Sequence, residues 1–430
     1  MKLKIILHAG LHKTGTTSIQ FNCKKYSNEL LAHDIYYVKF SKDGWENHSV
    51  PLCVLFQDTP RLQNHTVATM FKSDEAVASA KLQMSNYFSS ELSGNNSGTL
   101  LLSAEDLSGF SVENLEKVKK YFLEINDCDF EVVIYVRNPV SFALSDAQEL
   151  VRAGLKTIES AFEVGNLQNA ELKIKKFVNV FGINNIHVFS FDDAVEKYSD
   201  VSKHFFNFIG CSNVDMVKRV TNSSSSVEKI LTLVGCNSFG ADVIRKIYFV
   251  LSDDGSKFVP ENSLKNYIKL ASKNDEIYLK RKFNISFKDI KLIDDQTLNY
   301  LMLHKHILYV CEFLLSLKIS VTPLEIYIKI IRDTIIYLPK LSSLICVRAF
   351  NIYKSEAARN FLYHFKSIDI IDGDFFDDIF LLTKDKFLLD SFNAKEYLLK
   401  YSDVAVAGFD PFKHYYIFGQ FEGRNGFFNE

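Results

Sequence analysis

Short runs of consecutive apolar residues alternate with amphipathic stretches over the first 210 residues or so of the chain. Continuous apolar runs are typical of parallel strands that are covered on both faces. Apolar positions that recur every three or four residues predict helices. Because the two patterns alternate, they predict βαβ units. We therefore expect an α/β fold of three layers, with a central parallel sheet of about five strands.

The individual elements follow from these patterns. The predicted strands are Leu3–Leu7, Ile35–Val38, Thr99–Ser103, Glu131–Val136 and Ile186–Phe191. The predicted helices between them are Thr14–Tyr26, Val67–Leu92, Val112–Glu124, Pro139–Arg152, Glu171–Phe181 and Ala194–Ile209. Parallel strands need a crossover of this kind, usually a helix, between one strand and the next.

The pattern changes after the serine run Ser223–Ser226, where helical periodicity with few strand signals continues to about residue 380. The residues that follow are rich in Phe and Tyr. The expected organisation is a main domain of residues 1–298 (α/β core 1–210, helical lid 211–298), a helical extension over 299–380, and a small aromatic-rich C-terminal module over 381–430.

Charge excludes some classes of partner. The 430 residues include 50 Lys and Arg and 52 Asp and Glu, which gives a net charge of −2. A chain with this balance has no overall positive field, so we do not expect it to bind nucleic acid. Any anionic ligand has to be held by a local group of residues.

Cysteine spacing and hydropathy indicate where in the cell the protein is expected. The seven cysteines are scattered and include no CxxC pair, so neither a disulfide framework nor a zinc site is expected. No apolar run approaches the roughly 20 residues that span a bilayer, and the N-terminal run is too short for a signal peptide. We expect a cytoplasmic protein. Residues 326–354 alternate apolar and basic positions, which favours helix packing, with an amphipathic helix on a membrane surface as the alternative.

A loop rich in glycine and hydroxyl groups follows the first predicted strand. It runs from His8 to Ser18 and then enters a helix. Gly10 and Gly15 let the backbone approach an anion closely, and the start of the helix offers N–H groups. A nucleotide kinase carries lysine directly after its second glycine, whereas Lys13 precedes Gly15 here. The loop therefore predicts an anion site different from that of a kinase.

The segment His12-Lys13-Thr14-Gly15-Thr16-Thr17-Ser18-Ile19-Gln20 resembles the 5′-phosphosulfate loop of sulfotransferases, especially the bacterial carbohydrate type. The resemblance implies a P-loop-like fold and 3′-phosphoadenylyl sulfate (PAPS) as co-substrate, with no metal. It implies that Lys13 also acts in catalysis, by neutralising charge on the leaving group. The residues that would contact the donor are His12, Lys13, Thr14, Gly15, Thr16, Thr17 and Ser18.

A second element begins where the predicted strand Glu131–Val136 ends. Asn138 followed by Pro139 favours the start of a helix, so Arg137 is expected at the carboxyl end of a parallel strand, where ligands of open α/β sheets bind. Its planar guanidinium suits bidentate contact with phosphate. Sulfotransferases carry a Ser eight residues after such an Arg, and the resemblance implies that Arg137 and Ser145 hold the 3′-phosphate of PAPS.

Sulfuryl transfer to a hydroxyl or amine needs a base for the acceptor's proton. The resemblance places that base just after the strand Thr99–Ser103, where Glu105 is the candidate. The alternative for Glu105 or Asp106 is a capping role at the following helix. His48 is the second candidate for the base, and His12 is a third because it flanks the loop.

The aromatic-rich C-terminal segment is similar to a short module at the ends of bacterial surface-polysaccharide glycosyltransferases. The similarity is carried by the spacing of Tyr397, Asp403, Val404, Gly408, Pro411, His414, Tyr415, Gly419, Glu422, Gly423 and Arg424. We expect these aromatic side chains to form the core of a small helical hairpin, with stacking on sugar rings as the alternative.

Taken together, the motifs predict a PAPS-dependent sulfotransferase acting on a glycan, such as a bacterial surface polysaccharide. Two alternatives stay open: a P-loop nucleotide kinase, and a non-catalytic protein that binds nucleotide or glycan on the same fold. A kinase would bind ATP rather than a phosphoadenosine. Peripheral association with the inner membrane or with polysaccharide assembly enzymes fits the predicted role, and the oligomeric state does not follow from the sequence.

Overall fold

The computed structural model describes residues 2–94, 98–154, 162, 167–214, 216, 225–255, 257–258, 262–290, 298–334, 341–342, 345, 392–408, 411–415 and 424–425. The chain divides into two compact units. Unit 1 comprises Met1–Asp146, Phe162–Ser223 and Asn266–Lys291, and unit 2 comprises Ala147–Ala161, Ser224–Lys265 and Leu292–Glu430. Both units are discontinuous in sequence, and the segment 211–298 is divided between them. The predicted domain boundaries stay a prediction.

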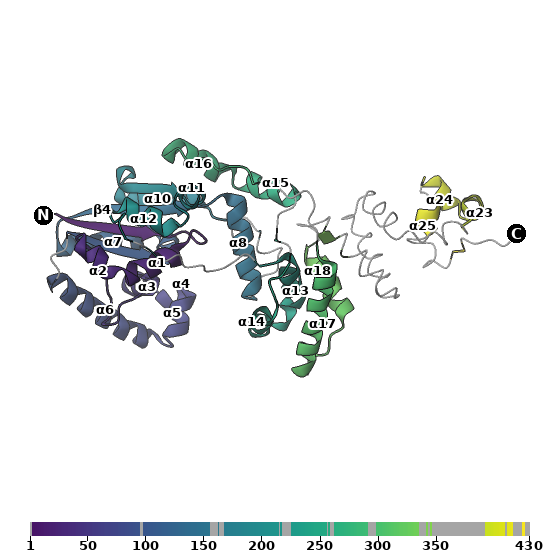
Figure 1. Cartoon of the computed structure of the whole chain (residues 1–430), viewed down its shortest axis with the longest axis horizontal. Helices are drawn as coiled ribbons and strands as arrows, with labels where there is room; N and C mark the ends of the chain where they lie inside the picture. The colour runs from purple at the N-terminus through teal and green to yellow at the C-terminus, as the bar shows by residue number, and fades with distance from the viewer. Residues whose placement is uncertain are drawn as a thin grey trace. The chain divides into compact units, whose positions relative to one another are not determined.

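The centre of unit 1 is a parallel sheet (Figure 1). Its five strands lie in the order β2-β3-β1-β4-β5. Its strands are β1 (Leu3–Ala9), β2 (Ile35–Tyr37), β3 (Thr99–Ala104), β4 (Cys128–Val136) and β5 (Ile186–Ser190). This confirms the predicted α/β class and all five predicted strands. Because β1 lies between β3 and β4, the strand order reverses at its carboxyl end, which is where open α/β sheets bind ligands.

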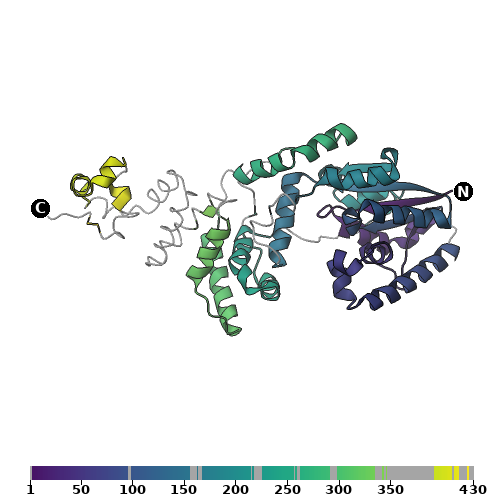
Figure 2. The same cartoon turned by 180° about the vertical axis from the view of Figure 1, so that it is seen from behind.

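Helices cover both faces of this sheet (Figure 2). The helices wholly or mainly within unit 1 are α1 (Thr16–Lys25), α2 (Ser27–Ala32), α3 (Ser49–Phe56), α4 (Pro60–Gln63), α5 (His65–Met70), α6 (Asp74–Gly94), α7 (Val112–Ile125), α8 (Pro139–Arg152), α10 (Ala170–Phe181), α11 (Phe191–Tyr198), α12 (Val201–Phe208) and α16 (Lys273–Phe283). The described residues of this unit also include the 3₁₀ helices η1 (Asp106–Gly109) and η3 (Ile183–Asn185).

The three layers follow from the pleat of the strands, which sends successive side chains to opposite faces. Ile5 and Leu7 of β1 pack into a core with α3, α6, α7 and α10. Ile6 of the same strand packs into a second core with α1 and α12. Both faces of the strand are therefore buried, which explains why its sequence is a continuous apolar run.

The carboxylate of Asp275 links the late segment of unit 1 to its α/β core. Its two oxygens accept hydrogen bonds from the first backbone N–H groups of α10, at Ala170 (2.7 Å) and Glu171 (3.0 Å). Leu279, one turn further along α16, is buried in the same core as β1. The segment Asn266–Lys291 is thus a structural part of the sheet domain.

Two predicted helices are each two helices in the structure. The predicted helix Val67–Leu92 is α5 followed by α6, because Ser73 accepts a hydrogen bond from Ala76 N and starts a new helix. The predicted helix Ala194–Ile209 is divided between α11 and α12, since Ser199 adopts a left-handed φ of 62° and Asp200 caps α12. These breaks depend on single polar residues within an otherwise helical pattern.

Unit 2 is built around α13 (Val227–Cys236), all ten residues of which are buried. It packs against α17 (Tyr300–Ser316) and α18 (Pro323–Thr334). Gly235 brings α13 close to α18, because a Cβ at this position would lie 2.7 Å from Ile326 Cγ2. Two further helices are α14 (Ala241–Val250) and α15 (Asn262–Ala271), the latter running from unit 2 into unit 1. Of the predicted extension 299–380, most residues after Thr334 lie outside the described ranges.

Near the C-terminus, three short helices surround a small aromatic core. They are α23 (Ala394–Lys400), α24 (Ser402–Val406) and α25 (Pro411–His414). Tyr397, Val404 and Tyr415 form the buried cluster, and the Tyr397 hydroxyl lies 2.9 Å from His414 Nδ1. Core packing accounts for these aromatic side chains, and the role of the module stays a prediction. No helix in the described part of the chain is both long and apolar enough to cross a membrane.

Candidate functional site

The loop between β1 and α1 has the backbone geometry of an anion site. Lys13 (φ 60°) and Gly15 (φ 75°) both adopt left-handed backbone, a conformation found in the concave turns that bind anions through main-chain N–H groups. Gly15 is the N-cap of α1 and provides no side chain to its first turn. The start of α1 therefore presents N–H groups and the positive end of the helix dipole at the carboxyl edge of the sheet.

Both glycines of this loop are needed for its packing. A Cβ at Gly10 would lie 2.4 Å from Thr16 Oγ1, and a Cβ at Gly15 would lie 2.5 Å from Val201 Cγ1. Real Cβ atoms do not approach other atoms this closely. The loop is thus held tightly between the end of β1 and helix α12, so its shape is fixed by the fold.

The hydroxyl groups of the loop divide into two sets. Thr14 donates to the carbonyl of Leu11, and Ser18 Oγ accepts a hydrogen bond of 2.9 Å from Ser202 Oγ, so these two groups stabilise the fold. Thr16 Oγ1 is buried and has no hydrogen-bond partner among the described residues. Thr17 is exposed. Thr16 and Thr17 are therefore the hydroxyls of this loop that are best placed to contact a ligand.

The structure brings Arg137 to this loop. Arg137 follows the last residue of β4, and its Nη1 donates a hydrogen bond of 3.1 Å to the main-chain carbonyl of Lys13. Its guanidinium lies over the ring of Phe191, with 5.2 Å between Cζ and the ring centroid. Burial lowers the pKa of Arg137, against the opposing charge of Asp192. Nε of Arg137 is buried and lacks a partner within the described ranges.

Ser145 lies on α8, which begins at Pro139 as the sequence predicts. Asn138 Oδ1 caps this helix by accepting from Val140 N (3.0 Å) and Ser141 N (3.3 Å). Ser145 is half-buried. Among the described residues it makes no hydrogen bond to Arg137 or to the β1–α1 loop, so the structure does not join these two predicted phosphate contacts directly.

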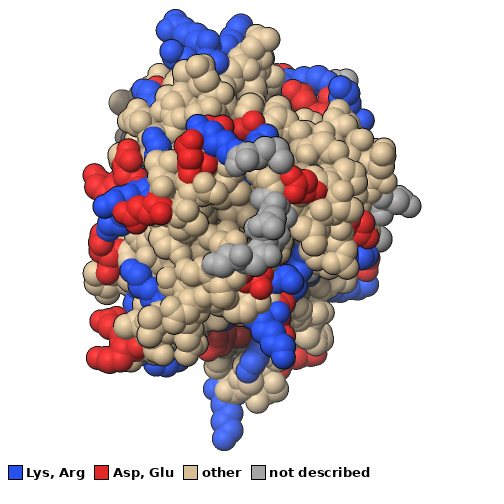
Figure 3. Space-filling view, turned by 90° about the vertical axis from the view of Figure 1, so that its left-hand side faces the viewer, with Lys and Arg blue, Asp and Glu red and all other residues tan. Residues whose placement is uncertain are grey.

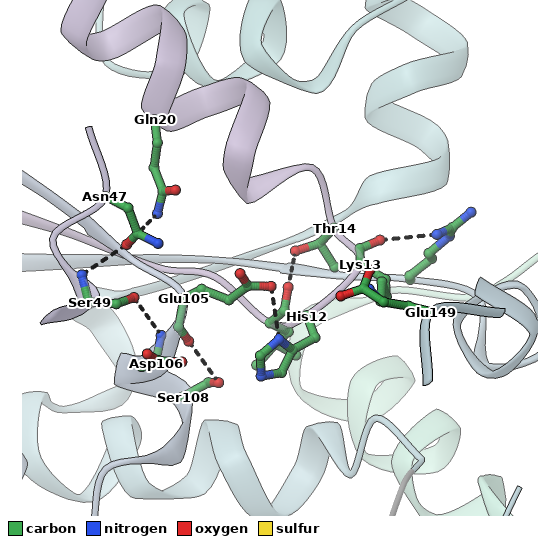
Figure 4. Close-up of polar contacts among 12 residues, drawn as sticks. His12, Lys13, Thr14, Gln20, Asn47, Ser49, Glu105, Asp106, Ser108 and Glu149 are labelled. Carbon is green, nitrogen blue, oxygen red and sulfur yellow. Dashed lines mark hydrogen bonds and ion pairs between the residues drawn. The ribbon is translucent and has the colours of Figure 1, made fainter. Parts of the chain in front are cut away.

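Glu105 and His12 form a pair across the carboxyl edge of the sheet. Glu105 directly follows β3, and its Oε1 lies 2.9 Å from His12 Nδ1 (Figure 4). The side chains are 26% and 49% exposed, respectively. The hydrogen bond with Glu105 raises the pKa of His12, against the effects of burial and of the charge on Lys173. An exposed imidazole is thus bonded to a carboxylate beside the loop.

The capping alternative for Glu105 is not what the structure shows. The Glu105 side chain makes no cap hydrogen bond to η1. Its main-chain carbonyl instead accepts from Ser108 Oγ (3.0 Å), while Asp106 Oδ2 accepts from Asn64 Nδ2 (2.7 Å). Figure 4 shows the Glu105 carboxylate turned toward His12 while its backbone begins η1.

His48, the second candidate for the base, is completely buried. Its Nδ1 accepts a hydrogen bond of 3.1 Å from Ser103 N, and its ring stacks on Tyr37 with 4.4 Å between centroids. Burial lowers the pKa of His48 to about 3. The imidazole is therefore a neutral group that fixes the end of β3, and it has no access to an acceptor from solvent.

Lys173 and Asp192 are charged residues near the site that the sequence analysis did not single out. Lys173 on α10 interacts electrostatically with Glu105 and His12, and burial lowers its pKa. Asp192 Oδ2 accepts a hydrogen bond of 2.7 Å from Asn138 N, and burial raises its pKa. In the sequence, Lys173 is one of three lysines in a surface helix, so only the packing of α10 distinguishes it.

Within the part of the chain that the structure describes, no group of three or more His, Cys, Asp or Glu residues could hold a metal ion. On the face shown in Figure 3, basic and acidic side chains are interspersed over the surface rather than gathered by sign. At the site itself, Lys13, Arg137 and Lys173 supply positive charge.

Comparisons with known proteins give two solved structures. No family model matches the chain, and no curated protein matches it. A sulfotransferase from Alicyclobacillus acidocaldarius is 17% identical, with a TM-score of 0.29 over 57% of this chain and 94% of its own. A sulfotransferase domain from the curacin biosynthetic pathway is 12% identical, with a TM-score of 0.30 over 52% of this chain and 80% of its own. At such TM-scores these likenesses support no further conclusion.

Proposed function

We propose that this protein is a sulfotransferase that moves a sulfuryl group from PAPS to a hydroxyl or amine of a glycan, such as a bacterial surface polysaccharide. The observation that carries the proposal is the hydrogen bond from Arg137 Nη1 to the carbonyl of Lys13. It brings together, at the point where the strand order reverses, the two elements that resemble the phosphosulfate loop and the 3′-phosphate site.

The residues present suit a donor with two separate anionic groups. Thr16 Oγ1 and Arg137 Nε are both buried without partners among the described residues, and a buried polar atom without a partner is costly unless a ligand satisfies it. In the proposal, the loop Lys13–Ser18 holds the 5′-phosphosulfate, and Arg137 with Ser145 holds the 3′-phosphate. PAPS supplies the sulfuryl group when it is bound.

The chain supplies the groups that handle charge and protons. Lys13 carries a positive charge on the loop, where it would offset negative charge on the leaving phosphate. His12 of this loop is paired with Glu105, which follows β3, and the pair would take the proton of the acceptor. A nucleotide kinase is disfavoured because Thr16, rather than lysine, follows Gly15.

Calorimetric titration with adenosine 3′,5′-bisphosphate and with ATP tests the donor site. We expect the bisphosphate to bind and ATP to bind weakly. The substitution Lys13→Ala should lower the affinity for the bisphosphate. Lys25→Ala is the matched control, since Lys25 lies on the exposed side at the end of α1. Tighter binding of ATP than of the bisphosphate would favour a kinase.

Transfer of labelled sulfate from PAPS to candidate glycans tests the activity. We expect incorporation of label that depends on Lys13 and does not require an added divalent metal. Binding of the bisphosphate without transfer to any acceptor in a broad glycan panel would favour a non-catalytic binding protein. A strict requirement for Mg²⁺ would contradict the proposal.

A further inference from the structure

His12 offers a ring nitrogen that the fold does not use. Nδ1 is bonded to Glu105 at 2.9 Å, while the side chain is 49% exposed. In the part of the chain that the structure describes, Nε2 has no hydrogen-bond partner. The imidazole is thus fixed at one nitrogen and open to solvent at the other, next to the loop that would hold the donor.

We propose that Nε2 of His12 takes the proton from the acceptor hydroxyl, and that Glu105 is a positioning residue that orients the imidazole. The inference rests on the proposed sulfotransferase function. It assigns the base to a residue of the loop itself rather than to the carboxylate after β3.

The geometry favours this division of roles. A carboxylate bonded to one ring nitrogen holds the N–H of that nitrogen toward itself, which leaves the other nitrogen unprotonated and able to act as a base. In Glu105, one oxygen is already bonded to His12. Its side chain is also the less exposed of the two, at 26% against 49%, so an acceptor that arrives from solvent reaches the imidazole more easily.

Hydrogen bonds hold the main chain at Glu105 and next to His12. Ser108 fixes the main chain of Glu105, since its N and Oγ bond to the Glu105 carbonyl at 3.3 and 3.0 Å. On the other side, Arg137 holds the carbonyl of Lys13, the residue next to His12. A base anchored in this way needs little rearrangement before it accepts a proton.

The charges around His12 set the pH at which it can act. Glu105 and Asp106, on the β3 side, favour its protonated form, whereas Lys173 on α10 and the neighbouring Lys13 on the loop are positive. The net effect is a raised pKa for His12, with the Glu105 hydrogen bond as the largest cause. Because a base must be deprotonated, the rate of transfer should rise with pH as His12 loses its proton.

The proton and electron balance closes without a further reactant. A bond forms between the acceptor oxygen and sulfur, and the bond between sulfur and the bridging oxygen of the donor breaks, with its electron pair leaving on the phosphate. The acceptor's proton moves to Nε2, while the Nδ1 proton stays in its hydrogen bond to Glu105. The imidazolium then releases its new proton to water.

The test compares His12→Ala with Glu105→Gln in the labelled-sulfate assay over a range of pH. If His12 is the base, His12→Ala should lower kcat by about 10²- to 10⁴-fold, and added imidazole should restore part of the loss. Glu105→Gln removes the charge that raises the pKa of His12. This variant should remain active, and the increase of its transfer rate with pH should occur at lower pH than in the wild type. Bisphosphate affinity should change little in Glu105→Gln, because Glu105 is not among the residues expected to contact the donor.

His33→Ala is the control, because His33 is an exposed histidine remote in sequence from the loop whose Nδ1 contacts only the carbonyl of Glu29. Thermal melting checks that each variant folds, and His12→Asn gives a second, smaller change of shape. A His12→Ala enzyme with near wild-type kcat, together with a Glu105→Gln enzyme inactive at every pH, would overturn the inference and leave the sulfotransferase proposal intact. Absence of transfer by the wild-type protein would overturn both.

Discussion

Arg137 at the end of β4 donates a hydrogen bond to the main-chain carbonyl of Lys13, 124 positions earlier in the chain. The contact ties the connection between β4 and α8 to the connection between β1 and α1, and it places a guanidinium against the main chain of the β1–α1 loop. The geometry of the loop therefore depends on Arg137, which lies outside the sequence motif of the loop.

Replacing Arg137 by Lys should therefore weaken nucleotide binding even though the positive charge remains. Lysine lacks the planar fork, so it cannot make a bidentate contact with a phosphate while it donates to the Lys13 carbonyl. Hydrogen bonds to charged groups contribute about 1.5–3 kcal/mol, which corresponds to roughly a 10- to 100-fold lower affinity for adenosine 3′,5′-bisphosphate by calorimetry. Arg61→Lys, at a surface pair with Asp74, should leave the affinity unchanged. Equal affinities for wild type and Arg137→Lys would argue against this role.

The loop turn can be tested through stability. Gly15→Ala combines a left-handed φ with a Cβ placed 2.5 Å from Val201, so we expect a loss of roughly 2–4 kcal/mol in the free energy of unfolding. Gly182 has φ 84° but nothing within 4 Å of its Cβ, and Gly182→Ala should cost only about 1 kcal/mol. Urea unfolding measures both. Similar losses of unfolding free energy in the two variants would mean that Val201 moves aside without destabilising the protein.

Buried histidines make stability depend on pH. Burial lowers the pKa of His48 and of His8 to about 3 from an ordinary 6.5. The unfolded chain takes up these protons below about pH 6.5 and the folded chain does not, so stability is complete above that pH and falls as the pH decreases toward 3. Each histidine should contribute about 1.4 kcal/mol per pH unit in that window.

The variant His48→Gln isolates one of these contributions. Between pH 6.5 and 5 it should lose about 2 kcal/mol less stability than the wild type does, measured by urea unfolding at each pH. His33→Gln, at an exposed site, should show the pH dependence of the wild type. An unchanged slope in His48→Gln would show that His48 is protonated in the folded protein.

Helix packing in unit 2 gives a prediction that is independent of the candidate site. Gly235→Ala should destabilise unit 2 by about 1–3 kcal/mol, since the added methyl group would meet Ile326 at 2.7 Å. Ile326→Ala should remove much of the clash, so the double variant should be more stable than the sum of the single effects predicts. Gly109→Ala, where nothing lies within 4 Å, is the control. Additive effects would contradict a direct contact.

The sequence was sufficient for elements whose signals are local. Mostly continuous apolar runs marked the strands of the sheet, and the pair Asn138–Pro139 marked the start of α8 because each residue has one favoured place at a helix terminus. The same patterns could not reveal α3. All eight of its residues are buried, so no polar face breaks the apolar run and no helical period is visible.

Side-chain environments are the part that the sequence could not supply. His48 and His12 are the same residue type, each near a predicted strand or loop, yet one is completely buried and the other half exposed. The pairing of Glu105 with His12 joins residues 93 positions apart, and it depends on β1 and β3 being neighbours. Lys173 likewise becomes part of the site only because α10 packs beside that edge.

The segment that carries Asp275 and Leu279 has a consequence for how this chain comes to be folded. Asp275, whose carboxylate caps α10, and Leu279, which is buried in the core of the sheet domain, both follow the last strand, β5, by more than 60 residues. On a ribosome, the α/β core therefore lacks its final support until residue 291 has emerged, by which time the first segments of unit 2 have already been synthesised. A nascent chain released at residue 210 would contain all five strands of the sheet and the whole β1–α1 loop. It would lack the carboxylate of Asp275, which accepts from Ala170 N and Glu171 N, and the side chain of Leu279, which packs into the core.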